Sequence, residues 1–87
     1  MVYRVRLTRT AARQLTDRLP EAAANACVEF LYGPLADDPH RVGAPLRKPF
    51  EGQWRARRGE YRVRYTIDDQ NHIVTVVDIS HRRDAYR

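Results

Sequence analysis

Residues 54–65 of this chain read WRARRGEYRVRY, in which arginines alternate with aromatic, apolar or small residues on either side of a Gly-Glu pair. Alternation with a period of two is the pattern of a strand that buries one face. The pair Gly59-Glu60 supplies a tight turn between two such strands. We therefore predict an antiparallel hairpin that joins residues 53–58 to residues 61–67.

The alternation assigns the side chains of this hairpin to two opposite faces. The face expected to enter the core carries Trp54, Ala56, Tyr61, Val63, Tyr65 and Ile67. The other face carries four arginines, namely Arg55, Arg57, Arg62 and Arg64. Residues two apart on a strand lie roughly ~7 Å apart on the same face, which is close to the spacing of neighbouring phosphates in a nucleic-acid strand. We expect these arginines to form one phosphate-binding patch.

Two further strands flank this hairpin in the sequence. Residues 2–7 alternate in the same way and predict a half-buried strand. Residues 72–80 form a nearly continuous apolar run, which is typical of a central strand covered on both faces.

Between the first strand and the hairpin the sequence predicts two helices and a loop. Thr8 or Thr10 caps the first helix, whose apolar residues recur every four positions, at Ala11, Leu15 and Leu19. Residues 21–32 form the second helix, which a Gly-Pro pair ends. The proline-rich residues 34–50 form a surface loop, from which Leu46 is expected to reach the core.

The order of elements is therefore β-α-α-β-β-β, within one domain that spans residues 1–87. This order predicts an α+β fold, an α/β sandwich in which an N-terminal helical hairpin packs on one face of a mostly antiparallel, four-stranded sheet. The opposite face is then open to a ligand.

Charge indicates what that ligand is. The chain has 87 residues, a net charge of +5 and a sequence pI of about 10, which indicates an acidic partner such as nucleic acid, an acidic protein or an anionic membrane. A genome rich in G and C favours arginine codons and could account for the total. It does not account for the placement, because residues 41–64 hold eight basic and two acidic side chains, a local charge of +6 (eight minus two).

Several classes of protein are excluded by what the sequence lacks. One cysteine, Cys27, allows no internal disulfide, suits a reducing cytoplasm and is expected to be a buried apolar side chain. Neither an apolar leader nor a run of about 18 apolar residues is visible, so no signal peptide and no membrane-spanning segment are expected, and no membrane partner is predicted. The three histidines lack the spacing of metal ligands, and no metal or cofactor is predicted.

Arginine stays protonated, so the patch can bind and stabilise negative charge but cannot act as a base. RNA carries its own nucleophile, the 2′-hydroxyl, and its cleavage needs only orientation, charge stabilisation and proton transfer. Further cations stand beside the patch, at Arg47, Lys48, Arg82 and Arg83. Tyr86 is a candidate for proton transfer because surrounding cations lower the pKa of a phenol, and His81 is the alternative.

Two motifs give the chain a family resemblance. Residues 59–65 fit the pattern G-x-Y-R-V-x-Y, and residues 81–86 fit H-R-x-x-x-Y. Together with the opening strand YRVRLT, they make the chain resemble the RelE/ParE superfamily of bacterial toxins from type II toxin–antitoxin systems, in its RelE-like branch.

The resemblance implies a metal-independent mRNA interferase. Such a toxin binds mRNA in the ribosomal A site, beside 16S rRNA, and promotes attack of the 2′-hydroxyl, which leaves a 2′,3′-cyclic phosphate. It also implies a cognate RelB-like antitoxin, and binding of operator DNA only by the toxin–antitoxin complex.

The resemblance also implies residue roles. Arg62 and Arg82 would stabilise the phosphorane, Arg55 and Arg57 would orient the RNA strand, and Tyr86 would transfer protons. Arg55 and Arg57 stand where studied members carry lysines, so charge stabilisation rather than a base role is expected of them.

Two other functions fit the same residues. ParE-type relatives share the fold and inhibit DNA gyrase by binding, without enzymatic activity. A catalytically inactive basic binding module would also keep the arginine patch. The H-R-x-x-x-Y ending and the arginine set favour the nuclease.

Overall fold

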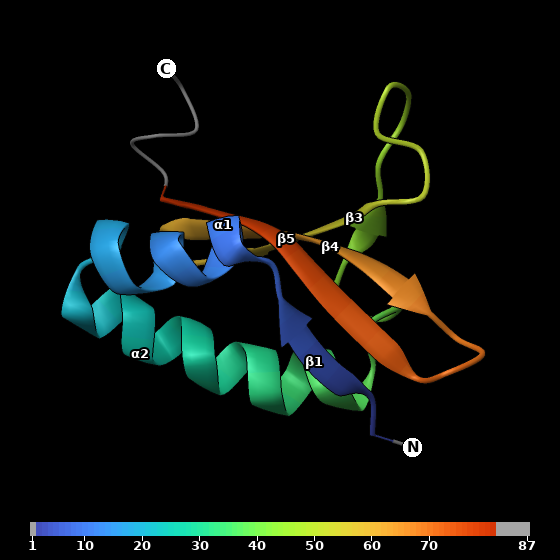
Figure 1. Ribbon diagram of the computed structural model, residues 1–87, viewed down its shortest axis with the longest axis horizontal. Coiled ribbons are helices and arrows are strands. Elements are labelled where there is room, and N and C mark those ends of the chain that lie inside the picture. Colours follow the sequence, from blue (N-terminus) through green and yellow to red (C-terminus); the bar gives the residue numbers. More distant parts are fainter. Residues whose placement is uncertain (1, 82–87) are drawn as a thin grey trace.

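A five-stranded sheet organises the computed structural model, which describes residues 2–81 (Figure 1). In sequence order the strands are β1 (Arg4–Leu7), β2 (Ala44–Pro45), β3 (Trp54–Arg58), β4 (Tyr61–Asp68) and β5 (Ile73–His81). Their order across the sheet is β1-β5-β4-β3-β2. Only the pair β1 and β5 is parallel among these strands, and the other neighbours are antiparallel. The predicted α+β class is confirmed.

The predicted number of four strands is wrong, because the loop contributes a fifth. Ala44 and Pro45 pair with Arg55 and Trp54 at the edge of the sheet. The amide of Leu46 extends this pairing by donating to the carbonyl oxygen of Gln53 at 2.9 Å. Two residues in a proline-rich segment carry too little alternation to identify a strand from sequence.

The helices lie along one side of the sheet, as predicted (Figure 1). The first, α1 (Arg9–Arg13), continues into a π-helical turn, η1 (Gln14–Arg18). Thr8 is its N-cap, and the Thr8 hydroxyl oxygen accepts from the amide of Ala11 at 3.2 Å.

The second helix is longer than predicted. It comprises α2 (Glu21–Phe30) and a π-helical turn, η2 (Leu31–Leu35), so the predicted end at Gly33-Pro34 is wrong. A wide π turn lets the chain pass the proline without breaking the helix. Leu35 is fully buried, and its burial stabilises this continuation of the helix.

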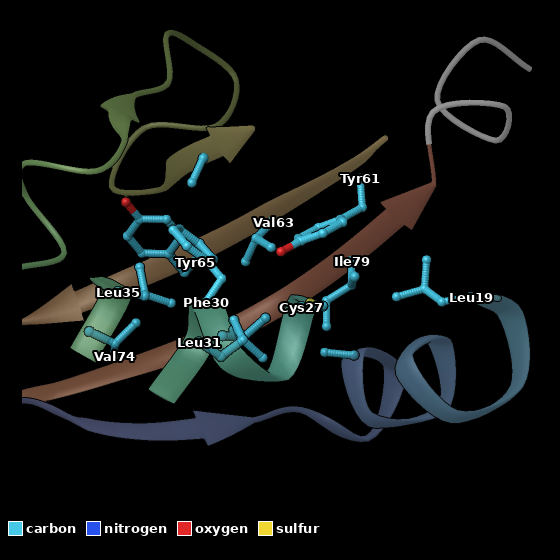
Figure 2. Close-up of a cluster of buried hydrophobic side chains, with 13 residues drawn as sticks. Leu19, Cys27, Phe30, Leu31, Leu35, Tyr61, Val63, Tyr65, Val74 and Ile79 are labelled. Carbon is cyan, nitrogen blue, oxygen red and sulfur yellow. The ribbon is translucent and has the colours of Figure 1, made fainter. Parts of the chain in front are cut away.

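The core fills the space between the helices and one face of the sheet (Figure 2). Its largest fully buried side chains include Leu31, Leu35, Tyr65, Val63, Val74, Val76 and Ile79. Cys27 is fully buried among them, and burial raises the pKa of its thiol to about 11. The prediction that Cys27 acts as an apolar core residue is confirmed.

Two predictions about burial are wrong. β5 is fully buried on one face only, since Val74, Val76 and Ile79 are buried while the residues between them keep partial exposure. Leu46 is half-buried on the open face rather than in the core, and the loop instead packs Val42 against the core. Loop side chains of similar hydrophobicity cannot be ranked for burial by sequence alone.

Within residues 2–81 every helix is too short or too polar to cross a membrane.

Candidate nucleic-acid interface

The face of the sheet opposite the helices gathers the four predicted arginines. In the register of β3 and β4, Arg55 lies directly opposite Arg64, and Arg57 lies directly opposite Arg62. Like charges in such positions repel each other, with Cβ atoms about 5 Å apart. A polyanion bound at this face would reduce the repulsion, so we interpret the face as a candidate site for one.

Three of these arginines line one cavity of about 570 Å³ on the open face. The complete lining is Gln14, Leu46, Phe50, Arg55, Arg62, Val63, Arg64, Asp78 and Ser80. Among these residues three are cationic and one is anionic, which gives a formal charge of +2 (three minus one). The volume lies within the range of about 300–1,000 Å³ that is usual for small-ligand sites.

A β-bulge in β5 turns Asp78 and Ser80 toward this cavity. Arg64 pairs with Asp78, but the next residue, Tyr65, pairs with Val76, so Val77 has no partner in the register. The extra residue reverses the alternation of β5, which then buries Ile79 and exposes its neighbours to the open face.

Gln14 of η1 holds this bulge in place. Its side-chain oxygen accepts from the amide of Ile79 at 2.7 Å, and its side-chain nitrogen donates to Asp78 Oδ1 at 2.8 Å. β1 pairs with β5 only as far as Val76, so Gln14 satisfies a backbone group that β1 no longer reaches. Sequence reasoning missed Gln14, because nothing in a helical pattern marks one glutamine as a strand partner.

Phe50 forms a second missed element of the cavity. It is 43% exposed, and the Arg64 guanidinium lies 5.0 Å from the centre of its ring. This distance is within the range of a cation–π contact. Within residues 2–81, Arg64 Nε is buried and has no hydrogen-bond partner. A buried donor of this kind indicates a site that a ligand or water completes.

Among residues 2–81, the other predicted site residues do not line this cavity. Arg57 is exposed on the same face beside Arg62. Arg47 and Lys48 are exposed in the loop before β3, where Lys48 Nζ lies 3.7 Å from Glu51 Oε1. Arg82, Arg83 and Tyr86 lie outside the described residues.

His81 is not brought together with the arginines. In the register it pairs with Tyr61, whose side chain belongs to the core, and its Nε2 lies 3.4 Å from Glu60 Oε2. Ser80, one residue earlier, pairs with Arg62 on the open face instead.

The two tyrosines of β4 are core residues, as predicted. The Tyr65 hydroxyl donates to the Pro39 carbonyl oxygen at 2.7 Å, and the Tyr61 hydroxyl donates to the Ala26 carbonyl oxygen at 3.1 Å. Burial raises the pKa of each phenol to about 12. Neither phenol is suited to proton transfer near neutral pH.

A second polar cluster lies where β1 begins, at the turn between β4 and β5. Asp69 Oδ1 accepts from the Tyr3 hydroxyl at 2.6 Å and lies 2.7 Å from His40 Nε2. The hydrogen bond from Tyr3, and then that from His40, lower the pKa of Asp69. This cluster joins three segments that are distant in sequence and is separate from the cavity.

Comparison with known proteins places this arrangement in a family. The model of the ParE toxin of the type II toxin–antitoxin system parDE matches residues 5–86. Toxin RelE of Mycobacterium tuberculosis is 55% identical over 85 residues, covering 98% of this chain and 87% of that protein. Toxin RelG of the same organism is 47% identical over 87 residues, covering 100% and 99%.

Comparison with solved structures finds a relative from the same kind of toxin–antitoxin system. The crystal structure of the toxin–antitoxin complex RelBE2 from Mycobacterium tuberculosis contains a chain that superposes with a TM-score of 0.91 at 45% identity. The match covers 94% of this chain and 100% of that one.

Proposed function

This chain belongs to the ParE toxin family of type II toxin–antitoxin systems, and within that family we propose that it is a ribosome-dependent endoribonuclease that cleaves mRNA and inhibits translation. The observation that carries the proposal is the convergence of Arg55, Arg62 and Arg64 on one cavity of the open face. Permanent cations on rigid strands fit the backbone of single-stranded RNA.

The chemistry uses the nucleophile that RNA itself supplies. The 2′-oxygen forms a bond to the adjacent phosphorus while the bond from phosphorus to the 5′-oxygen breaks, which leaves a 2′,3′-cyclic phosphate. The 2′-hydroxyl loses a proton and the departing 5′-oxygen gains one. Arg62 stabilises the extra negative charge on phosphorus, and Arg55 and Arg57 hold the RNA strand in line.

Proton transfer is assigned to Tyr86, with Arg82 as a second cation at the phosphate; both residues lie outside the described part of the chain. His81 ranks behind Tyr86, since it pairs with Tyr61 rather than with a residue of the open face. No metal ion is needed in this scheme, because the arginines supply the positive charge.

The proposed partners follow from the same family. The related RelBE2 toxin was crystallised in a toxin–antitoxin complex, and we infer a cognate RelB-like antitoxin for this chain. The net charge of +5 favours an antitoxin segment with acidic side chains. Operator DNA is expected to bind the complex rather than the toxin alone. Ribosomal mRNA and 16S rRNA as targets imply a cytoplasmic location.

Gyrase inhibition is the second candidate, because the matching family model is that of ParE. The two functions differ in their first effect after induction. Loss of protein synthesis with new mRNA ends supports the nuclease, whereas altered plasmid supercoiling with intact mRNA supports gyrase inhibition.

The decisive experiment compares Arg62→Ala with the matched control Arg18→Ala, which removes an exposed arginine from η1 on the helical side. Removal of one charge-stabilising donor is expected to slow mRNA cleavage about 10²- to 10³-fold. Arg18→Ala is expected to cleave at the wild-type rate. Primer extension on mRNA from programmed ribosomes measures both, and thermal unfolding verifies that each variant is folded. Undiminished cleavage by a double variant, Arg62→Ala with Tyr86→Phe, would refute the proposal.

A further inference from the structure

We propose that the cavity on the open face binds one unstacked nucleobase of single-stranded RNA, and that Phe50 is the platform on which this base stacks. The inference rests on the proposed function, because it takes RNA as the ligand. It extends that function from the phosphate backbone to the base beside it.

Phe50 is partly exposed, and packing of the hydrophobic core does not explain its position. The core lies between the helices and the other face of the sheet, and Phe50 does not belong to it. Phe50 is also one of four large apolar residues exposed within residues 2–81, and among these four it alone lines the arginine cavity. The partly exposed Phe50 ring, beside the cations of this cavity, offers an aromatic surface on which a base can stack.

The backbone holds Phe50 firmly at this place. Its amide donates to the Arg47 carbonyl oxygen at 3.0 Å, and its own carbonyl oxygen accepts from the Gln53 amide at 3.0 Å. Gly52 adopts a φ of +87°, which glycine tolerates best, and so closes the turn. Figure 1 shows this loop rising between β2 and β3, away from α2. A backbone that is held before binding loses little entropy when a base stacks on the ring it carries.

Arg64 completes the platform. Its guanidinium lies 5.0 Å from the centre of the Phe50 ring, and its Nε is buried without a hydrogen-bond partner among the described residues. The guanidinium carries further N–H donors besides the buried Nε, so it can stack and still donate to an acceptor atom on a base or phosphate. Arg55 and Arg62 line the same cavity and can bind the neighbouring phosphate. Base and backbone contacts thus meet within one site.

The test separates base stacking from catalysis by using RNA that cannot be cleaved. Six-nucleotide 2′-O-methyl RNAs carry 2-aminopurine at one position each, and stacking on a protein ring quenches its fluorescence. The full chain is titrated at low salt as wild type, Phe50→Ala, Phe50→Leu and Phe50→Trp. Tyr32→Ala is the matched control, since it removes another exposed aromatic ring from the opposite, helical side.

We expect quenching by the wild type, Tyr32→Ala and Phe50→Trp at the same RNA position. Phe50→Ala and Phe50→Leu should bind about ten- to a hundredfold more weakly and should not quench, because they lack the ring. Equal quenching by the wild type and Phe50→Ala would overturn the proposal, as would the absence of quenching by the wild type at every position. Cleavage of unmodified mRNA is measured separately, so quenching that depends on Phe50 in a protein that cleaves nothing would refute the nuclease and retain the base site.

Discussion

The two faces of β4 differ in what they do for the protein. On the helix-covered face Tyr61, Val63 and Tyr65 are buried and hold the helices to the sheet. On the open face Arg62 and Arg64 alternate with them and oppose the arginines of β3. A single strand therefore carries both core packing and the proposed ligand binding, and the period of two keeps the two apart.

The comparison teaches that the open face lowers the stability of the fold, and that the buried side chains of the covered face must compensate for this loss. Opposed arginines repel, and Phe50 leaves 43% of its surface exposed. Because the side chains of the two faces alternate along the strand and point to opposite sides of the sheet, substitutions on one face should leave the other intact. The following predictions test this separation, from the largest expected effect to the smallest.

The covered face should be the more sensitive to added volume. A Cβ at Gly43 would overlap with Tyr65 Oη and would lie 2.7 Å from the Arg55 carbonyl oxygen. Gly43→Ala is therefore expected to lower the free energy of unfolding by about 3 kcal/mol, since both backbone and a fully buried tyrosine must move. Urea unfolding measures the change.

Gly33→Ala is the matched control, because a Cβ at Gly33 meets no atom within 4 Å. This variant should be neutral or raise the stability by about 0.5 kcal/mol, as expected for glycine replaced by alanine in a helix. Equal losses in the two variants would show that the close contact at Gly43 is not what limits substitution.

The bulge joins the two faces, so its loss should affect both. Gln14→Ala removes the acceptor of the Ile79 amide and the donor to Asp78. We expect a loss of about 1–2 kcal/mol in the free energy of unfolding, since a backbone amide loses its partner. RNA affinity of the folded protein should fall as well, because Asp78 and Ser80 line the cavity. A loss of stability with unchanged RNA affinity would contradict the role of the bulge in shaping the cavity.

The smallest effect is expected at the Tyr3–Asp69 cluster, which belongs to neither face. The hydrogen bond from Tyr3 lowers the pKa of Asp69 and raises the pKa of Tyr3. A lowered carboxyl pKa stabilises the fold above the unfolded value of about 4 and loses this effect as pH falls through the folded value. A raised phenol pKa stabilises it below about 10 and loses this effect as pH rises through the folded value.

The stability difference between the wild type and Tyr3→Phe should therefore be largest near neutral pH and shrink in acid and in strong base. Thermal unfolding across pH measures this difference. Tyr32→Phe, which alters an exposed tyrosine, should show no such dependence. A difference that is constant with pH would contradict the assigned hydrogen bond.

The sequence was a good guide to the hairpin that forms the open face. Strict alternation at residues 54–65 predicted which side chains are buried, and the structure agrees at Ala56, Val63 and Tyr65. It was a poor guide where the alternation of a strand or the periodicity of a helix is interrupted. The bulge at Val77 and the π turn through Pro34 both depend on partners far away in the chain.

The functional roles of Arg82, Arg83 and Tyr86 stay predictions, and so does that of His81. For the arginines of the open face the structure adds their mutual positions. It also adds Gln14, Phe50 and Asp78, whose residue types are too common to stand out in a sequence.

Local patterns by themselves determined the type of the main strands and helices, the family motifs and the sign of the charge, because periodicity, turn chemistry and ionisation are properties of neighbouring residues. Only the tertiary structure decided that Phe50 and Gln14 meet the arginines at one cavity and that His81 faces away from it. Those contacts join residues far apart along the chain, and their geometry depends on strand register and on a bulge that no local pattern specifies.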